Sequence, residues 1–234
     1  MKKLVIFDLD GTLLNTIGDL SEAANKVLEA HGLPVHTLEE FETFVGRGMR
    51  NLIKAALPED RRSDDFIDAA LAEFLDYYLS HIDNYTVPYP GMPELLSELQ
   101  DRGCLLAVAS NKVQAGAETL IAGFFPDIDF VGVLGNHPGC PLKPDAAVVN
   151  LLMQKAGVDA ASTTMVGDSA IDIATARNAG VRSIAVSWGF RPRGDLAGAD
   201  VICDDAEGLL AALKINDVPP SRCLPTCHPT GRGG

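Results

Sequence analysis

Residues 1–16 read MKKLVIFDLDGTLLNT and contain the pattern that decides the fold. The apolar run at residues 4–7 has the length and the branched side chains of a buried strand. Asp8 and Asp10 follow it, and Gly11 then permits backbone angles that a larger residue disfavours. Because two neighbouring carboxylates repel each other, the pattern indicates that a positive charge lies between them.

The composition is that of a folded protein with an acidic surface. The chain has 234 residues, of which 47% are hydrophobic and 22% charged, and its net charge is -13. This charge argues against partners such as nucleic acid or an anionic membrane. The first apolar run stops at Asp8, which is too early for a signal peptide, and no stretch approaches the ~18 apolar residues that span a bilayer. Five scattered cysteines are typical of free thiols, so we expect a cytoplasmic protein.

Strand-like runs and helical patterns alternate along most of the chain. Strands are expected at residues 4–7, 105–109, 130–134, 163–166, 183–186 and 200–203, and helices at residues 92–102, 114–124, 145–157 and 171–179. Short links between such elements predict an α/β fold, a doubly wound parallel sheet with helices on both faces.

Residues 16–85 differ, because they contain amphipathic helical patterns and no clear strand. We expect them to form a small helical domain inserted into a core domain that comprises residues 1–15 and 86–214. Residues 215–234 are rich in Pro and Gly and are expected to form a tail without a core of its own. Cys223, Cys227 and His228 in this tail lack the spacing of a zinc site.

Four polar stretches follow strand-like runs, where the carboxyl ends of parallel strands form a ligand-binding edge. They are DLDGT at residues 8–12, SNK at residues 110–112, KP at residues 143–144 and GDSAID at residues 167–172. Each stretch by itself also fits a turn, a helix cap or a solvated face. Together, in this order and at one sheet edge, they are hard to explain by the needs of folding.

These stretches supply the groups that a metal-assisted phosphoryl transfer requires. Asp8, Asp10 and Asp168 offer the hard oxygen ligands that Mg²⁺ prefers, so a magnesium ion is the expected positive charge between the aspartates. Ser110, the backbone amides near Asn111, and Lys143 are suited to hold phosphoryl oxygens. A carboxylate beside a metal-bound phosphate can act as a nucleophile and form an aspartyl-phosphate.

The pattern resembles the haloacid dehalogenase superfamily of phosphohydrolases over residues 1 to about 214. The resemblance rests on FDLDGTLLNT, ASNK, LKPD and VGDSAIDI, in that order. The insertion after the first motif is similar to the helical cap of the family's C1 type. SNK, KPD and VGDSAIDIATARNAG resemble the phosphoglycolate phosphatase branch most closely.

The resemblance implies a role for each acidic residue. Asp8 is expected to be the nucleophile and a Mg²⁺ ligand. Asp10 is expected to be the general acid and then the base, and its backbone carbonyl also to contact the metal. Asp168 is the expected third ligand, while Asp172 would orient the metal's waters or Lys143.

The resemblance also implies a phosphate-binding set. Thr12 and Ser110 would bind phosphoryl oxygens through their hydroxyls, Gly11 and Asn111 through their backbones, and Lys143 through its ammonium group. One departure is Asn15, where the family often has an acidic residue, and it bears on closure of the cap or on specificity.

Substrate choice is expected to lie with the cap. Arg47 and Arg50, beside the glycines of VGRGMR, are candidates to meet a substrate carboxylate, and ordinary surface arginines are an equal reading. The most consistent interpretation is an enzyme, a Mg²⁺-dependent phosphatase of a small phosphorylated metabolite, acting as a monomer or homodimer.

Three alternatives are weaker. A sugar phosphomutase of the β-phosphoglucomutase type shares the core and the cap. A haloacid dehalogenase proper does not need Asp10. A phospho-accepting signalling domain carries its aspartate after the third strand of a much shorter chain, by resemblance to such domains.

Overall fold

The computed structural model describes residues 2–215, so all but the first residue of the tail predicted at residues 215–234 lies outside the described residues. Its strands are β1 (Leu4–Phe7), β2 (Leu14–Asn15), β3 (Val87–Pro88), β4 (Leu105–Val113), β5 (Phe130–Asn136), β6 (Thr163–Gly167), β7 (Arg182–Val186) and β8 (Val201–Cys203). Its α-helices are α1 (Ile17–Ala30), α2 (Leu38–Phe44), α3 (Met49–Ala56), α4 (Asp64–Ser80), α5 (Met92–Asp101), α6 (Gln114–Phe124), α7 (Ala147–Ala156), α8 (Ala170–Ala179) and α9 (Ala206–Leu213). Short 3₁₀ helices cover Glu59–Arg61, Ala160–Ser162 and Arg193–Leu196.

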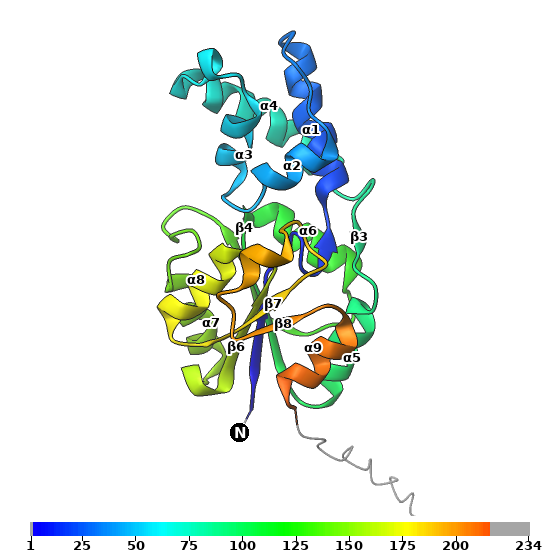
Figure 1. Ribbon diagram of the computed structural model, residues 1–234, viewed down its shortest axis with the longest axis vertical. Coiled ribbons are helices and arrows are strands. Elements are labelled where there is room, and N and C mark those ends of the chain that lie inside the picture. The colour runs from blue at the N-terminus through cyan, green and yellow to red at the C-terminus, as the bar shows by residue number, and fades with distance from the viewer. Residues whose placement is uncertain (1, 216–234) are drawn as a thin grey trace, which may run out of the picture.

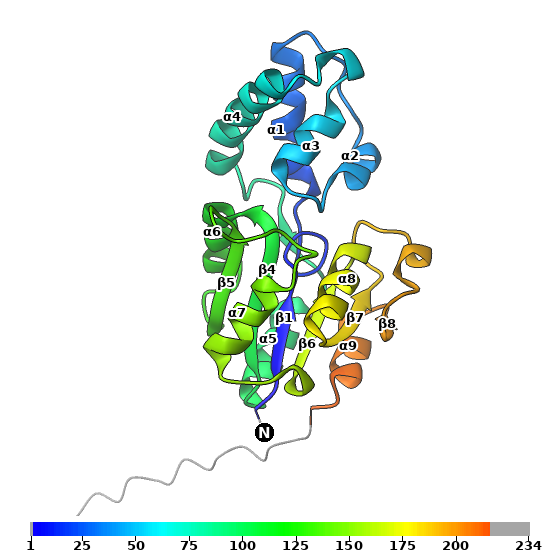
Figure 2. The ribbon, with the colours of Figure 1, turned by 90° about the vertical axis from the view of Figure 1, so that its left-hand side faces the viewer.

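Six strands form one parallel sheet in the order β5-β4-β1-β6-β7-β8. β1 lies in the middle, and its four residues are all buried, because helices cover both faces (Figures 1 and 2). Val5 and Phe7 belong to the core cluster that includes α5, α6 and α9, whereas Leu4 and Ile6 pack with α7 and α8. The predicted α/β fold with a doubly wound parallel sheet is confirmed.

The strand β4 differs from its prediction, because it continues past residue 109 to Val113. Its pairing with β5 shifts register between Ala109 and Val113, so residues 110–112 form an irregular end of the strand. The SNK stretch therefore lies within β4, at its carboxyl end, and its side chains are buried there. The apolar pattern predicted the regular part of the strand, whereas the polar residues concealed its continuation.

Helices α1–α4 pack together beyond the carboxyl ends of the central strands (Figures 1 and 2). Their apolar faces form the contact, and Thr37 and Glu40 cap α2 reciprocally. None of the helices in residues 2–215 has the length and apolar character needed to cross a membrane. The division into core, inserted helical domain and tail stays a prediction.

Two chain segments join these helices to the sheet, and they pair with each other. β2 and β3 form a two-stranded antiparallel ladder that the sequence did not indicate. On α1, the buried carboxylate of Asp19 accepts hydrogen bonds from the backbone N–H groups of Tyr85 and Thr86 and from the Thr86 hydroxyl, at 2.7–3.2 Å. Asp19 thus fastens the returning segment to the outgoing one.

Candidate active site

The loop after β1 brings its carboxylates to the edge of the sheet by a tight turn. Gly11 has a φ of +81°, and a Cβ at this position would lie 2.3 Å from Oδ2 of Asp168. Only glycine satisfies both the backbone angle and the close approach. On the other side of Asp168, the N–H of Phe190 donates to the same Oδ2 at 2.8 Å.

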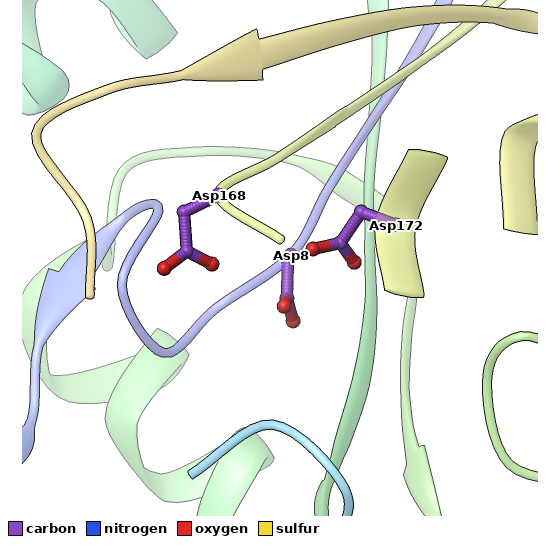
Figure 3. Close-up of side chains that lie close together, drawn as sticks. All are labelled: Asp8, Asp168 and Asp172. Carbon is purple, nitrogen blue, oxygen red and sulfur yellow. The ribbon is translucent and has the colours of Figure 1, made fainter. Parts of the chain in front are cut away.

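Asp8, Asp168 and Asp172 form a buried acidic cluster (Figure 3). They come from the end of β1, the segment after β6 and the first turn of α8, and one carboxylate oxygen of each lies within 4.8 Å of the others. The Lys143 ammonium contacts Oδ1 of Asp8 at 2.8 Å and Oδ1 of Asp172 at 2.7 Å. Although burial opposes its charge, Asp172 and Asp8 together hold the pKa of Lys143 above its usual value.

The three aspartates of this cluster carry more negative charge than the single ammonium of Lys143 neutralises. Burial raises the pKa of Asp8 well above its usual value, and Asp172 and Asp168 add to this effect against the opposing charge of Lys143. Burial, followed by the charge of Asp172, raises the pKa of Asp168 to about 7. A cation between these carboxylates would stabilise their ionised forms.

The donor set fits a magnesium ion. The N–H of Leu9 and the Lys143 ammonium both contact Oδ1 of Asp8, and the N–H of Phe190 contacts Oδ2 of Asp168. The other carboxylate oxygen of each residue has no hydrogen-bond partner among residues 2–215. Both oxygens of Asp172 are occupied, by Lys143 and by Ser169, which suits an indirect role. Carboxylate oxygens of this kind are the ligands that Mg²⁺ prefers.

Asp10 faces a different set of partners. Its Oδ1 accepts a hydrogen bond from the Thr16 hydroxyl at 2.7 Å and contacts the ammonium of Lys112 at 2.8 Å. Lys112 Nζ also lies 4.8 Å from the centre of the Tyr78 ring, on α4. The carboxylate of Asp10 is therefore fixed by hydrogen bonds and does not contact Lys143.

Asn111 forms hydrogen bonds to neighbouring segments through its side chain. Its Oδ1 accepts from the N–H of Lys143 at 2.8 Å, and its Nδ2 donates to the carbonyl of Lys143 and to that of Gly46, each at 3.1 Å. Asn111 thereby fixes the lysine segment to β4 and binds the loop between α2 and α3. Ser110, one residue earlier, accepts from the N–H of Lys112 at 3.2 Å.

A cavity of about 30 Å³ separates the sheet edge from the inserted helices. From the core it is lined by Asp8, Asp10, Ser110, Asn111, Lys112, Asp168, Ser169, Phe190 and Arg191, and from the α2–α3 loop and α3 by Val45, Gly46, Gly48 and Met49. Arg191 contacts the carbonyls of Glu42 and Val45, so it ties the core to this loop. The volume is room for about one or two water molecules, so the loop closes over the site.

Three of the predicted site residues lie apart from this group. Arg50 pairs with Asp64 and Asp68 on the surface of the inserted helices, at 2.7 Å each. Arg47 is exposed and lines a neighbouring open cleft. The Thr12 hydroxyl is completely buried and has no partner among the described residues, so a contact with phosphate requires the loop to shift.

Sequence reasoning assigned no role to Lys112 or Thr16, although both contact the site. The position of Lys112 in the sequence did contain a signal. A lysine this close to the end of a buried strand is itself buried only if its charge has a partner, so the position predicts an ion pair. Thr16 gave no such signal, since its partner, Asp10, lies across a turn.

This fold and this arrangement of carboxylates match a known family. Residues 5–186 match the model of the haloacid dehalogenase-like hydrolases, and the chain belongs to this family. It is therefore a hydrolase, as the four motifs predicted.

Several relatives share one description. The chain is 36% identical over 194 residues to a phosphoglycolate phosphatase of Mesorhizobium japonicum, a match that covers 82% of this chain and 86% of that protein. It is also 36% identical over 217 residues to a phosphoglycolate phosphatase of Agrobacterium fabrum, covering 91% and 93%. A crystal structure from Lactobacillus delbrueckii subsp. bulgaricus, expected to be a phosphoglycolate phosphatase, superposes with a TM-score of 0.85 at 33% identity and covers 91% of this chain and 99% of that one. The predicted similarity to phosphoglycolate phosphatases is confirmed.

Proposed function

We propose that this protein is a Mg²⁺-dependent phosphatase of small phosphomonoesters, with 2-phosphoglycolate as the first candidate substrate. The observation that carries the proposal is the pair of buried carboxylates, Asp8 and Asp168, each with a free oxygen, beside the ammonium of Lys143. The names of the relatives supply the candidate substrate.

In the proposed reaction, Asp8 and Asp10 act in turn. An oxygen of Asp8 attacks phosphorus, the bond from phosphorus to the alcohol oxygen breaks, and Asp10 gives its proton to the departing alkoxide. Asp10 then takes a proton from water, whose oxygen attacks the phosphorus of the aspartyl-phosphate. Phosphate leaves, and Asp8 regains its carboxylate.

The remaining residues bind and orient. Lys143 and the Ser110 hydroxyl hold phosphoryl oxygens, with the backbone around Gly11 and Asn111, and the Thr12 hydroxyl joins them if its loop shifts. The positive charge of Lys143 also offsets the repulsion between the Asp8 carboxylate and the phosphate.

The proposed Mg²⁺ site uses the carboxylates of Asp8 and Asp168 and the backbone carbonyl of Asp10, with Asp172 holding Lys143 in place. When bound, such an ion offsets the negative charge on the phosphoryl oxygens and orients them for attack. The four positions arise from β1, β6 and α8, so they are held by rigid elements.

We also propose a cellular compartment for this protein. Cys104 and Cys203 are buried free thiols, which is typical of a reducing compartment and supports a cytoplasmic enzyme. Its proposed partner is a small phosphorylated metabolite, and it is expected to act as a monomer or a homodimer.

The test is phosphate release from a panel of esters, with Mg²⁺ or with EDTA, by the wild type, Asp8→Asn and the exposed control Asp60→Asn. We expect release from 2-phosphoglycolate that requires Mg²⁺, is lost in Asp8→Asn and is kept in the control. The panel also contains pyrophosphate, nucleotides and sugar phosphates. If the wild type releases no phosphate but converts β-glucose 1-phosphate into the 6-phosphate, the protein is a mutase and the proposal fails.

A further inference from the structure

Lys112 is the second lysine of the site, and the catalytic scheme above does not use it. It arises from the irregular end of β4, is only 1% exposed and lines the cavity. A lysine is rarely so buried unless its charge has a purpose or a partner. Its partner is Oδ1 of Asp10, at 2.8 Å, on the side of the cavity where the leaving alcohol departs in the proposed reaction.

The two lysines differ in their free hydrogen-bonding capacity. Lys143 contacts two carboxylates, Asp8 and Asp172. Among the described residues, the Lys112 ammonium forms an ion pair only with Asp10 and otherwise faces the Tyr78 ring, and Asp10 is held independently by Thr16. An ammonium group has three N–H donors, so Lys112 has donors left for a further acceptor in the cavity.

The charge of the site also calls for this cation. When Asp10 carries the proton that the proposed reaction requires, Asp8, Asp168 and Asp172 bear three negative charges, which face the two lysines and one Mg²⁺, and a phosphate dianion adds two more negative charges. A substrate that bears an anion in addition to its phosphate then needs a positive partner. Arg191 lines the cavity too, but its guanidinium donates to two backbone carbonyls, that of Glu42 on α2 and that of Val45 directly after α2.

The position of Lys112 limits how far away such an anion can lie. The Tyr78 ring, completely buried on α4, covers one side of the ammonium at 4.8 Å and restricts where Lys112 can reach. Because Asp10 must protonate the leaving oxygen in the proposed reaction and the Lys112 ammonium lies 2.8 Å from Oδ1 of Asp10, the ammonium is close to a group that lies next to that oxygen.

We propose that Lys112 is a specificity-determining residue that binds a carboxylate one carbon from the ester oxygen. This inference rests on the proposed phosphatase function and narrows its substrates to phosphate esters of short 2-hydroxy acids. Lys112 lines the cavity, whereas Arg47 and Arg50 lie outside it.

The test compares two esters that differ only in charge, 2-phosphoglycolate and its carboxamide, phosphoglycolamide. Wild-type kcat/KM should favour the acid by roughly 10- to 100-fold, the contribution of a charge-assisted hydrogen bond. In Lys112→Met this ratio should fall to near one, mainly through KM for the acid. The exposed control Lys54→Met should keep the wild-type ratio.

Three outcomes overturn the inference. One is an unchanged ratio in Lys112→Met, and another is an equal loss on both esters, which would mean that Lys112 acts only by orienting Asp10. The third is a ratio lost in Arg47→Met but kept in Lys112→Met. If Lys112→Met does not fold, Lys112→Gln replaces it, because its amide keeps a donor for Asp10 without the charge.

The design separates this inference from the proposed function. If wild-type protein with Mg²⁺ hydrolyses both esters but Lys112 does not set their ratio, the phosphatase stands and only the inference fails. If the wild type hydrolyses neither these esters nor any other in the panel, both fail together.

Discussion

The substitution Asp168→Asn should stabilise the metal-free protein at alkaline pH while removing its response to Mg²⁺. Folding raises the pKa of this carboxyl from 3.8 to about 7 because the group is buried and faces Asp172. The folded state then binds a proton that the unfolded state releases, so stability falls as pH rises from about 4 to 7. With these values, the destabilisation is roughly 2 kcal/mol at pH 5 and roughly 4 kcal/mol at pH 8.

An asparagine avoids this loss, because it carries no charge and its amide oxygen can still accept the hydrogen bond from Phe190. The free energy of unfolding, measured by urea denaturation in EDTA, should therefore differ between variant and wild type by about 2–3 kcal/mol more at pH 8 than at pH 5. The value is an upper limit, since a buried site relaxes when it ionises. Asp60→Asn is the matched control for the loss of one aspartate charge at an exposed position.

Magnesium should reduce the stability advantage of Asp168→Asn over the wild type. At a concentration 100 times its Kd, Mg²⁺ would stabilise the wild type by about 2.7 kcal/mol, and the variant by much less. The reasoning is refuted if the difference between variant and wild type is the same at both pH values. It is refuted equally if Mg²⁺ stabilises Asp168→Asn as much as the wild type, since Asp168 would then not be a ligand.

Three further substitutions test the contacts between the helices and the sheet. Asp19→Ala leaves buried N–H donors of the returning segment without their acceptor and should lower the free energy of unfolding by about 2–4 kcal/mol in urea denaturation; a loss below 1 kcal/mol would contradict this role. Arg191→Met removes the contacts to the α2–α3 loop, so KM for the best ester should rise by roughly 10-fold with a smaller change in kcat, measured by steady-state phosphate release; an unchanged KM would show that the loop needs no such tie. Arg50→Met breaks only exposed ion pairs, so unfolding should change by less than about 1 kcal/mol and kcat/KM should stay the same; a large loss of activity would return this residue to the site.

Local sequence information was sufficient for the regular parts of the fold. The apolar run before Asp8 predicted β1 with its observed bounds, and the pattern at residues 114–124 predicted α6. β1 depends on burial of a continuous apolar run and α6 on burial of helically spaced side chains, and a sequence displays both patterns directly. The end of β4 was missed, because Ser110, Asn111 and Lys112 are buried for the sake of the site and do not follow the apolar pattern.

The sequence by itself determined which chemical groups gather at the sheet edge, since parallel strands bring their carboxyl ends together wherever the chain crosses between them. It thus gave the acidic set of Asp8, Asp10 and Asp168 with Lys143. Only the tertiary structure decided which cation belongs to which carboxylate: Lys143 to Asp8, and Lys112 to Asp10. These pairs join residues more than a hundred positions apart. Their geometry depends on the strand order, on the irregular end of β4 and on the position of α4, none of which is a local property of the chain.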